Sequence, residues 1–331
     1  MTNSIAKPSI VVLGASGLLG TAVTRLLSER PVRLRVVGRR PTAVPANCRA
    51  EVEVRTADLT EGTHLADAVA DADAVIHLVA HIAGPGTWRV ASGDRTAERV
   101  NVGLVHDLIA AVEARPKPEP PVVLFAGSMS QAGKALATRI DGSIPDEPLT
   151  EYDRQKLAAE QALEAATRRG VLRGATLRLA TLFGQGTDST LLDRGVVAAM
   201  MRRAYADQPL TMWHDGTVKR DLLCIDDAAR AFLAALDHAD VVTGEHWLVG
   251  SGQVVSIAEL FATIAKLVSA CSRKPPVPVI SVPPAEHAMP TDLLDFALDP
   301  SHFQRATGWQ PQETLLGALE RAAVAYAKEQ A

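Results

Sequence analysis

The feature that most constrains the fold is a glycine-spaced turn, formed by Gly14, Gly17 and Gly20, that directly follows the apolar run at residues 9–13. A strand, a glycine-rich turn and a helix in this order direct backbone N–H groups and the positive end of the helix towards an anion. Glycine is needed where a side chain would obstruct the anion or strain the backbone. The turn therefore predicts a βα unit that holds the pyrophosphate of a dinucleotide.

Strand-like and helix-like segments alternate through the first half of the chain. Short apolar runs at residues 32–37, 51–55, 74–79 and 122–125 are separated by helical patterns. This alternation predicts an α/β fold, a Rossmann-type doubly wound parallel sheet covered by helices on both faces.

The alternation becomes irregular after about residue 184, where helical stretches dominate and prolines interrupt them. A chain of 331 residues exceeds the usual size of a single core. We therefore expect a dinucleotide-binding Rossmann domain over residues 1–184, with crossings from about residues 211–250, and a smaller C-terminal lobe over residues 185–331 that mainly binds substrate.

Composition and charge exclude several classes of function. The net charge of −4, without a long basic stripe, argues against nucleic acid as a partner. The three cysteines, Cys48, Cys224 and Cys271, are scattered and lack CxxC spacing, which indicates a reducing, cytoplasmic compartment and no metal site. The uncharged stretch at residues 8–24 is interpreted as the buried βα turn rather than a signal peptide. No transmembrane helix is predicted, so we expect no membrane partner.

The choice of dinucleotide depends on the end of the second strand, which reads Val37-Gly38-Arg39-Arg40. An NAD site normally places a carboxylate here to bind the ribose 2′-hydroxyl. This chain has two guanidinium groups instead, which suit a 2′-phosphate. The sequence therefore favours NADPH over NADH, and the alternative is that Arg39 and Arg40 are two solvated surface arginines.

A tyrosine and a lysine four residues apart, Tyr152 and Lys156, lie in a helical pattern over residues 153–166. This spacing puts both side chains on one face of the helix. A phenol titrates near 10, and an adjacent ammonium favours the phenolate, so we expect Lys156 to lower the pKa of Tyr152. Tyr152 would then protonate a carbonyl oxygen as hydride reaches its carbon.

The GxxGxxG turn and the YxxxK pair together resemble the extended branch of the short-chain dehydrogenase/reductase superfamily, the NAD-dependent epimerase/dehydratase family. The resemblance implies that Ser128, with Ser130 as the runner-up, polarises the substrate carbonyl, and that Lys156 also binds the nicotinamide ribose. A capping role for the serine is the alternative. Asn101 matches a family asparagine that is structural or holds water.

The resemblance also implies which residues line the cofactor. Asp58 and Leu59 match the position that brackets the adenine, the end of the fourth strand runs beneath the ribose and nicotinamide, and residues 177–184 match the strand beside the nicotinamide. The residues assigned to NADP(H) binding are Gly14, Ser16, Gly17, Leu18, Leu19, Gly20, Arg39, Arg40, Asp58, Leu59, Leu78, Val79, Ala80, Lys156, Leu179 and Thr181.

The second half of the chain carries segments that resemble the substrate side of the family. Residues 213–227 are similar to its GDGxxxRDFVxVDD segment, in which the arginine matching Arg220 reaches the diphosphate of a sugar nucleotide. Trp213 would pack against the nucleobase or belong to the core. Asp226 and Asp227 would cap and tether a helix. His81 would lie close to the nicotinamide and substrate, or be structural.

Within this family, residues 77–84, 87–89 and 211–217 look like the 4-ketoreductases of deoxysugar biosynthesis. The resemblance implies reduction by NADPH of the C4 ketone of a dTDP-4-keto-6-deoxyhexose, a nucleotide-sugar substrate, and a homodimer. Sugar-nucleotide dehydratases carry an Asp-Glu pair where this chain has Met129 and Ser130, so dehydration lacks its acid and base.

Three alternative functions remain open. A nucleotide-sugar epimerase on the same fold would recycle its cofactor, usually NAD, and Arg39 and Arg40 speak against it. A reductase of a non-nucleotide ketone or aldehyde would not be inhibited by dTDP. A non-catalytic NADP sensor would typically lack the pair formed by Tyr152 and Lys156, which this chain has.

Overall fold

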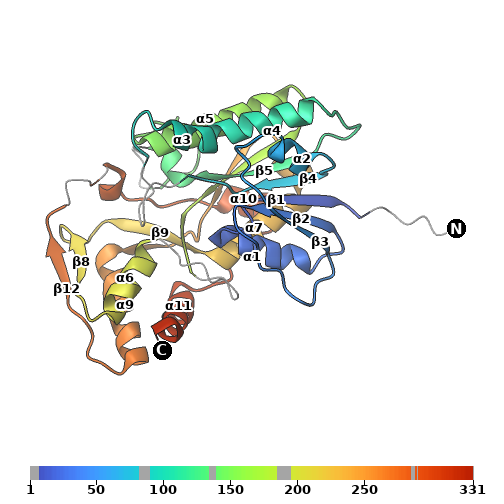
Figure 1. Cartoon of the computed structure of the whole chain (residues 1–331). Helices are drawn as coiled ribbons and strands as arrows, with labels where there is room; N and C mark the ends of the chain where they lie inside the picture. Colours follow the sequence, from blue (N-terminus) through green and yellow to red (C-terminus); the bar gives the residue numbers. More distant parts are fainter. Residues whose placement is uncertain are drawn as a thin grey trace.

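The structure is a computed structural model that describes residues 7–81, 90–133, 139–184, 195–284, 288 and 290–330. A large twisted sheet lies between two layers of helices, and a smaller lobe of short strands and helices is attached beside it (Figure 1). The predicted α/β fold class is confirmed.

The main sheet has seven strands, and every pairing between neighbours is parallel. In spatial order the strands are β10 (His246–Val249), β6 (Arg173–Leu179), β5 (Val122–Ser128), β4 (Ala74–His77), β1 (Ser9–Leu13), β2 (Arg33–Gly38) and β3 (Glu51–Thr56). The chain order reverses between β1 and β4. In open α/β sheets, ligands bind at the carboxyl ends of the strands beside such a reversal.

Alternating side chains of the central strands feed two separate cores. Val12 and Ile76 point into the core beneath α1 (Leu18–Ser28) and α7 (Ile225–Asp237), and Val11 and Val75 point into the core on the opposite face. That second face is covered by α2 (His64–Val69), α4 (Leu104–Glu113) and α5 (Glu151–Arg168), as Figure 1 shows. Both faces are apolar because helices cover both. The shorter helical segments are α3 (Arg95–Glu98), the π-helical η1 (Arg99–Gly103), η2 (Met129–Ala132), α8 (Ala239–Val242), η3 (Pro290–Leu293) and α10 (Ser301–Thr307).

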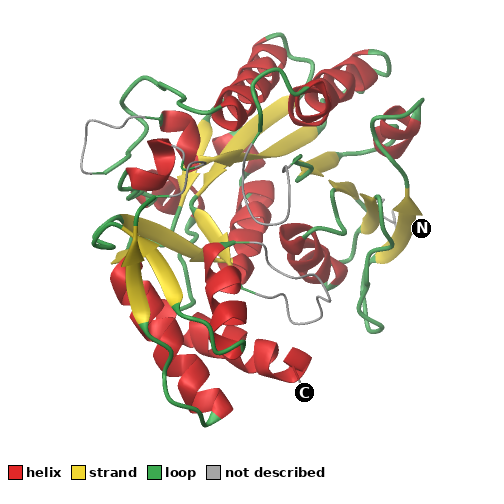
Figure 2. Cartoon of the chain, turned by 60° about the vertical axis from the view of Figure 1, so that its left-hand side comes forward, coloured by secondary structure: helices red, strands yellow, loops and turns green. Residues whose placement is uncertain are grey.

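The smaller lobe has a core of its own, built around Met201, Ile264 and Leu319. These residues come from α6 (Val196–Tyr205), α9 (Ile257–Ser272) and α11 (Leu315–Gln330), which pack beside two small sheets (Figure 2). The sheets are β11 (Val254–Ser256), β9 (Lys219–Cys224) and β7 (Thr181–Phe183), and β12 (Val279–Val282) with β8 (Leu210–Trp213).

Two aspartates at the start of α7 connect distant parts of the chain. Asp227 is buried and accepts hydrogen bonds from the backbone N–H groups of Gln312, at 2.7 Å, and Glu313, at 3.0 Å. Asp226 pairs with Arg25 on α1 at 3.0 Å. These contacts give the pair the tethering role that the sequence predicted.

Candidate active site

The glycine turn has the geometry of an anion cradle. Gly14 has φ of +84°, and a Cβ there would lie 3.0 Å from the carbonyl carbon of Leu78. A Cβ on Gly20 would lie 2.2 Å from the Gly14 oxygen, so the first turn of α1 packs directly on the loop. Gly17 caps α1 without a side-chain hydrogen bond, and its first turn holds no acidic residue. The N–H groups of Leu18, Leu19 and Gly20 belong to the first turn of α1, where the helix itself offers them no acceptor, and they fit a pyrophosphate.

The predicted adenosine end lies where β2 and β3 finish. Arg39 and Arg40 follow β2 and are exposed, and Arg40 Nη2 donates to the Ser16 carbonyl at 3.3 Å. Gly38 lies directly against Ser16, because a Cβ on it would lie 2.5 Å from the Ser16 hydroxyl. The sequence-predicted Ser16, Arg39 and Arg40 are thus brought together.

Asp58 and Leu59 follow β3 at the same edge of the sheet. The Thr60 hydroxyl, its N–H and, to a smaller extent, Arg39 lower the pKa of Asp58. Asp58 Oδ1 accepts from both Thr60 groups, at 2.6 and 2.9 Å, and Leu59 is buried. The carboxylate therefore shapes its own turn and keeps its charge beside Arg39.

Beyond β4, the half-buried residues Leu78, Val79, Ala80 and His81 run past the glycine turn. Asn101 holds this segment in place. Its Oδ1 accepts from the His81 N–H at 2.7 Å, and its Nδ2 donates to Gln155 Oε1 on α5 at 2.9 Å. Asn101 is buried in the π-helical η1, so it acts here as a structural asparagine. The resemblance at residues 82–84 and 87–89 lies outside the described residues.

Tyr152 and Lys156 lie on α5, whose start is set by a capping box between Thr150 and Asp153. Lys156 is 2% exposed and Tyr152 7%. Lys156 Nζ donates to the Ala126 carbonyl of β5 at 2.8 Å and lies 5.9 Å from the centroid of the Tyr152 ring. The two side chains are therefore brought together at the carboxyl end of β5.

Burial controls the protonation of both groups. It lowers the pKa of Lys156 from its ordinary 10.5 to about 7. Burial, and after it the Asp153 carboxylate, raise the pKa of Tyr152. The prediction that Lys156 lowers the pKa of Tyr152 is wrong for the free protein, because burial of the phenol raises this pKa. Tyr152 therefore keeps its proton at neutral pH, which is the form that an acid needs.

His77, at the end of β4, contributes no charge to this site. Burial, and to a smaller extent Lys156, lower its pKa to about 3. Neither ring nitrogen has a hydrogen-bond partner in the part of the chain that the structure describes, and the ring packs edge-on against Phe125 at 5.6 Å. His77 is a neutral part of the core.

Ser128 is the last residue of β5 and caps η2. Its Oγ lies 2.7 Å from the Ser130 Oγ, and its N–H donates to Gln131 Oε1 at 2.7 Å. Ser130 in turn donates its hydroxyl to Asp153. Ser128 and Ser130, the two serines predicted from the sequence, are therefore linked to each other and to the helix of Tyr152.

A buried network of charged and amide side chains, which sequence reasoning missed, supports the end of β5 that carries Ser128. Arg178 on β6 is 2% exposed and pairs with Asp146, at 2.7 and 2.6 Å, and with Glu160. Gln131 Nε2 donates to Glu160 at 3.1 Å. Since Gln131 also accepts from the Ser128 N–H, the network connects Arg178 to the predicted catalytic serine. The neighbouring Leu179 and Thr181 lie at the carboxyl end of β6 and the start of β7.

The predicted substrate residues Trp213 and Arg220 lie in the smaller lobe, on β8 and β9. The Arg220 guanidinium donates to the carbonyls of Thr291, Asp292 and Leu294, and stacks on the Phe296 ring at 5.5 Å. Within the described ranges, no hydrogen bond joins Trp213 or Arg220 to the residues around Tyr152. The guanidinium is thus engaged with backbone where the sequence predicted a diphosphate contact.

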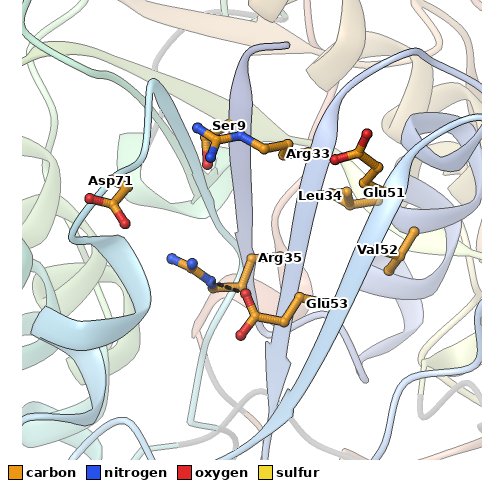
Figure 3. A pocket seen from close by; sticks show the side chains of 8 residues that line it. All are labelled: Ser9, Arg33, Leu34, Arg35, Glu51, Val52, Glu53 and Asp71. Carbon is orange, nitrogen blue, oxygen red and sulfur yellow. Dashed lines mark hydrogen bonds and ion pairs between the residues drawn. The ribbon is translucent and has the colours of Figure 1, made fainter. Parts of the chain in front are cut away.

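A pocket of about 400 Å³ lies at the opposite edge of the sheet, at the amino ends of β1, β2 and β3 (Figure 3). Most of the residues that line it are charged, and Arg35 pairs with Glu53 at 2.7 Å. This pocket is separate from the candidate active site, which lies at the carboxyl ends.

None of the helices described is long and apolar enough to cross a bilayer. The described histidines, cysteines and carboxylates form no group of three that could hold a metal ion.

Comparisons with known proteins agree with the geometry. Residues 10–250 match the family model described as "NAD dependent epimerase/dehydratase family". A dTDP-6-deoxy-L-talose 4-dehydrogenase (NAD(P)(+)) from Kitasatospora kifunensis is 29% identical over 318 residues, 95% of this chain and 94% of that protein. A 2′-dehydrokanamycin reductase from Streptomyces kanamyceticus is 27% identical over 338 residues, 98% of this chain and 83% of that protein. MoeE5, solved in complex with UDP-glucose and NAD, has the same fold, with a TM-score of 0.81 at 23% identity over 98% of this chain and 100% of that one.

Proposed function

The chain belongs to the NAD dependent epimerase/dehydratase family, and we propose that it is an NADPH-dependent reductase of the C4 ketone of a dTDP-4-keto-deoxyhexose that already lacks two or three hydroxyls. The observation that carries the proposal is the placement of buried Tyr152 and Lys156 at the carboxyl end of β5, in a sheet that also carries the glycine turn. The names of two relatives, a dTDP-6-deoxy-L-talose 4-dehydrogenase and a 2′-dehydrokanamycin reductase, support redox chemistry on the substrate.

Each residue has one part in this reaction. The cofactor, when bound, supplies a hydride to C4. Tyr152 donates its proton to the oxygen at C4, because its raised pKa keeps the phenol protonated at neutral pH. Ser128 holds that oxygen by a hydrogen bond, and Lys156 binds the nicotinamide ribose. The amides at the start of α1 hold the pyrophosphate.

The preference for NADPH rests on Arg39 and Arg40. We expect the double variant Arg39→Ala/Arg40→Ala to bind NADPH about 100-fold more weakly, since two charge-assisted contacts to the 2′-phosphate are lost. Its NADH affinity should change by less than about twofold, because NADH lacks that phosphate. Fluorescence titration with both nucleotides measures the effect.

A control is Arg33→Ala, which removes one positive charge at the start of β2, the end farthest from Arg39. It should leave both affinities as in the wild type. Equal weakening of NADPH and NADH binding in the double variant would contradict a 2′-phosphate site.

Lys156 predicts a proton uptake on cofactor binding. The pKa of Lys156 is about 7 in the free protein, and we expect it to rise when NADPH binds, because the ribose hydroxyls accept hydrogen bonds from the ammonium form. NADPH should therefore bind with uptake of a proton near pH 8, and its affinity should fall as the pH rises above 7, by up to about tenfold per unit. Calorimetry in buffers of different ionisation enthalpy measures the protons taken up.

Two variants that each remove one lysine charge serve as controls for this measurement. Lys156→Met should take up fewer protons than the wild type, whereas Lys117→Met should match the wild type, because Lys117 pairs with Asp73 at the opposite edge of the sheet. Identical proton uptake in wild type and Lys156→Met would refute the assignment.

One observation favours a second candidate, the reductase of a ketone that carries no nucleotide. The guanidinium of Arg220, from which a diphosphate contact was expected, donates to three backbone carbonyls of residues 291–294. The relative named 2′-dehydrokanamycin reductase is consistent with that candidate. Competition by dTDP separates the two, since only a nucleotide-sugar reductase should be inhibited.

The deciding experiment offers a panel of dTDP-4-keto sugars with NADPH and with NADH, and follows absorbance and product configuration. One NADPH oxidised per sugar reduced is the expected result. Epimerised sugar without net oxidation of NADPH would assign the chain to the epimerases of its family instead.

A further inference from the structure

A buried carboxyl group lies directly after the proposed proton donor. Asp153 is 1% exposed, and its Oδ1 accepts the hydroxyl of Ser130, which lies 2.7 Å from the hydroxyl of Ser128. Its Oδ2 accepts from the Thr150 N–H at 3.2 Å and from the Thr150 hydroxyl at 2.5 Å. Capping of α5 therefore uses Oδ2, and Oδ1 is left to Ser130, through which it is linked to Ser128.

Asp153, Ser130 and Ser128 form a hydrogen-bond chain, and the hydrogen atoms in it can be counted. A carboxylate only accepts, and a serine hydroxyl has one hydrogen and two lone pairs. With Asp153 ionised, Ser130 gives its hydrogen to Asp153, so the hydrogen of Ser128 must point at Ser130. Ser128 then offers a lone pair to the substrate, which suits an alcohol but not a ketone.

A proton on Asp153 Oδ1 reverses the direction of donation along this hydrogen-bond chain. Asp153 then donates to Ser130, and Ser130 donates to Ser128. The lone pairs of Ser128 are filled by the Ser130 hydroxyl and by the Ser130 N–H, which lies 3.3 Å from Ser128 Oγ. The hydrogen of Ser128 is thereby free to point at a ketone oxygen.

We propose that Asp153 is a positioning residue that sets, through Ser130, whether the hydroxyl of Ser128 donates to the substrate oxygen or accepts from it. The inference rests on the proposed reduction of a ketone and adds to it the requirement that Asp153 carries a proton when the ketone binds.

The surroundings of Asp153 favour such a proton. Burial raises its pKa, and the bonds from Ser130 and Thr150 offset this only in part. The charged and titratable groups beside it are Arg154, an exposed cation that weakly favours the carboxylate, and Tyr152, a neutral phenol. Within the described part of the chain, η2 and Thr150 bring only hydroxyl and amide groups to the carboxyl.

Asp153→Asn is the decisive variant. The obligate donor Thr150 N–H requires the amide oxygen on its side, which turns the amide NH₂ towards Ser130. The variant therefore keeps the cap and fixes the hydrogen of Ser128 outward at every pH. With saturating NADPH, so that titration of free Lys156 does not enter, wild-type kcat for reduction should fall about tenfold as Asp153 ionises. In Asp153→Asn this step should be absent.

The matched control is Asp94→Asn, since Asp94 also caps a helix, α3, with its carboxylate, and no serine hydroxyl of the described residues donates to it. Its pH profile should follow the wild type. Ser128→Ala should slow reduction at the pH values where Asp153 is protonated and should lack the pH step, because it has no hydroxyl hydrogen to turn. A pH step in Asp153→Asn identical to that of the wild type would overturn the proposal.

An infrared measurement tests the chain without any substrate. The carboxylic acid C=O band that disappears in Asp153→Asn belongs to Asp153. In Ser130→Ala this band should persist to higher pH, because the carboxylate has lost a donor. If no ketone in the panel is reduced, the proposed function fails while the infrared result still judges the hydrogen-bond chain. A band with the same titration in wild type and Ser130→Ala refutes the chain.

Discussion

Tyr152→Phe is expected to lower kcat for ketone reduction by about 10²- to 10⁴-fold, the range that a positioned acid contributes. The substitution removes the phenol O–H and keeps the buried ring. Lys156 is anchored on the Ala126 carbonyl and the pyrophosphate cradle lies on α1, so neither depends on the phenol. The affinity for NADPH should therefore stay within about twofold of the wild type, an effect below about 0.5 kcal/mol.

Stopped-flow absorbance at saturating NADPH measures the chemical step, and fluorescence titration measures binding. The matched control is Tyr205→Phe, which removes a hydroxyl that donates to the Ala323 carbonyl in the smaller lobe, at 2.7 Å. Its kcat should remain close to that of the wild type. Wild-type turnover by Tyr152→Phe would remove Tyr152 from the mechanism.

The part of the site that depends on local spacing could be predicted from the sequence. The strand at residues 9–13 and the positive φ of Gly14 follow from one short motif, because a pyrophosphate cradle allows few backbone paths. The helix of Tyr152 and Lys156 was expected over residues 153–166 and runs from Glu151 to Arg168. Its start is earlier because Thr150 and Asp153 form a capping box, a signal that the sequence contains.

The electrostatics could not be predicted in the same way. Spacing places Lys156 near Tyr152, but the sign of the phenol shift depends on how much solvent each group loses. Arg220 lies in a segment that resembles the family, yet its contacts with the carbonyls of residues 291–294 depend on a fold that joins positions 71 to 74 residues apart. Asp153 and Ser130 likewise meet across 23 residues.

The buried network around Arg178 is the largest feature of the site that no local sequence pattern predicts. An arginine between leucines, in residues 177–179, is indistinguishable from a surface residue on an alternating strand. Its partners Asp146 and Glu160 are 32 and 18 residues away and come from a loop and from α5. Although burial alone lowers the pKa of Arg178, hydrogen bonds to Glu160 and Asp146 raise it above its ordinary value.

Arg178→Met is expected to lower the free energy of unfolding by about 3–5 kcal/mol, because removing one partner leaves two carboxylates uncompensated beside the core. The loss should also reach catalysis. Glu160 accepts from Gln131, and Gln131 accepts from the Ser128 N–H, so a displaced Glu160 moves the serine that holds the substrate oxygen. We expect kcat to fall at temperatures where the variant is still folded.

Urea unfolding followed by circular dichroism measures the stability. The control Arg173→Met removes the same side chain five residues earlier on β6, where its partner Asp240 is 93% exposed, and should cost less than about 1 kcal/mol. Adding Glu160→Gln to Arg178→Met should recover part of the loss, since it removes one unpaired buried charge. If Arg178→Met lowers the free energy of unfolding no more than Arg173→Met does, the carboxylates of Asp146 and Glu160 must be solvated or protonated instead. The network would then not stabilise the end of β5 on which Ser128 depends.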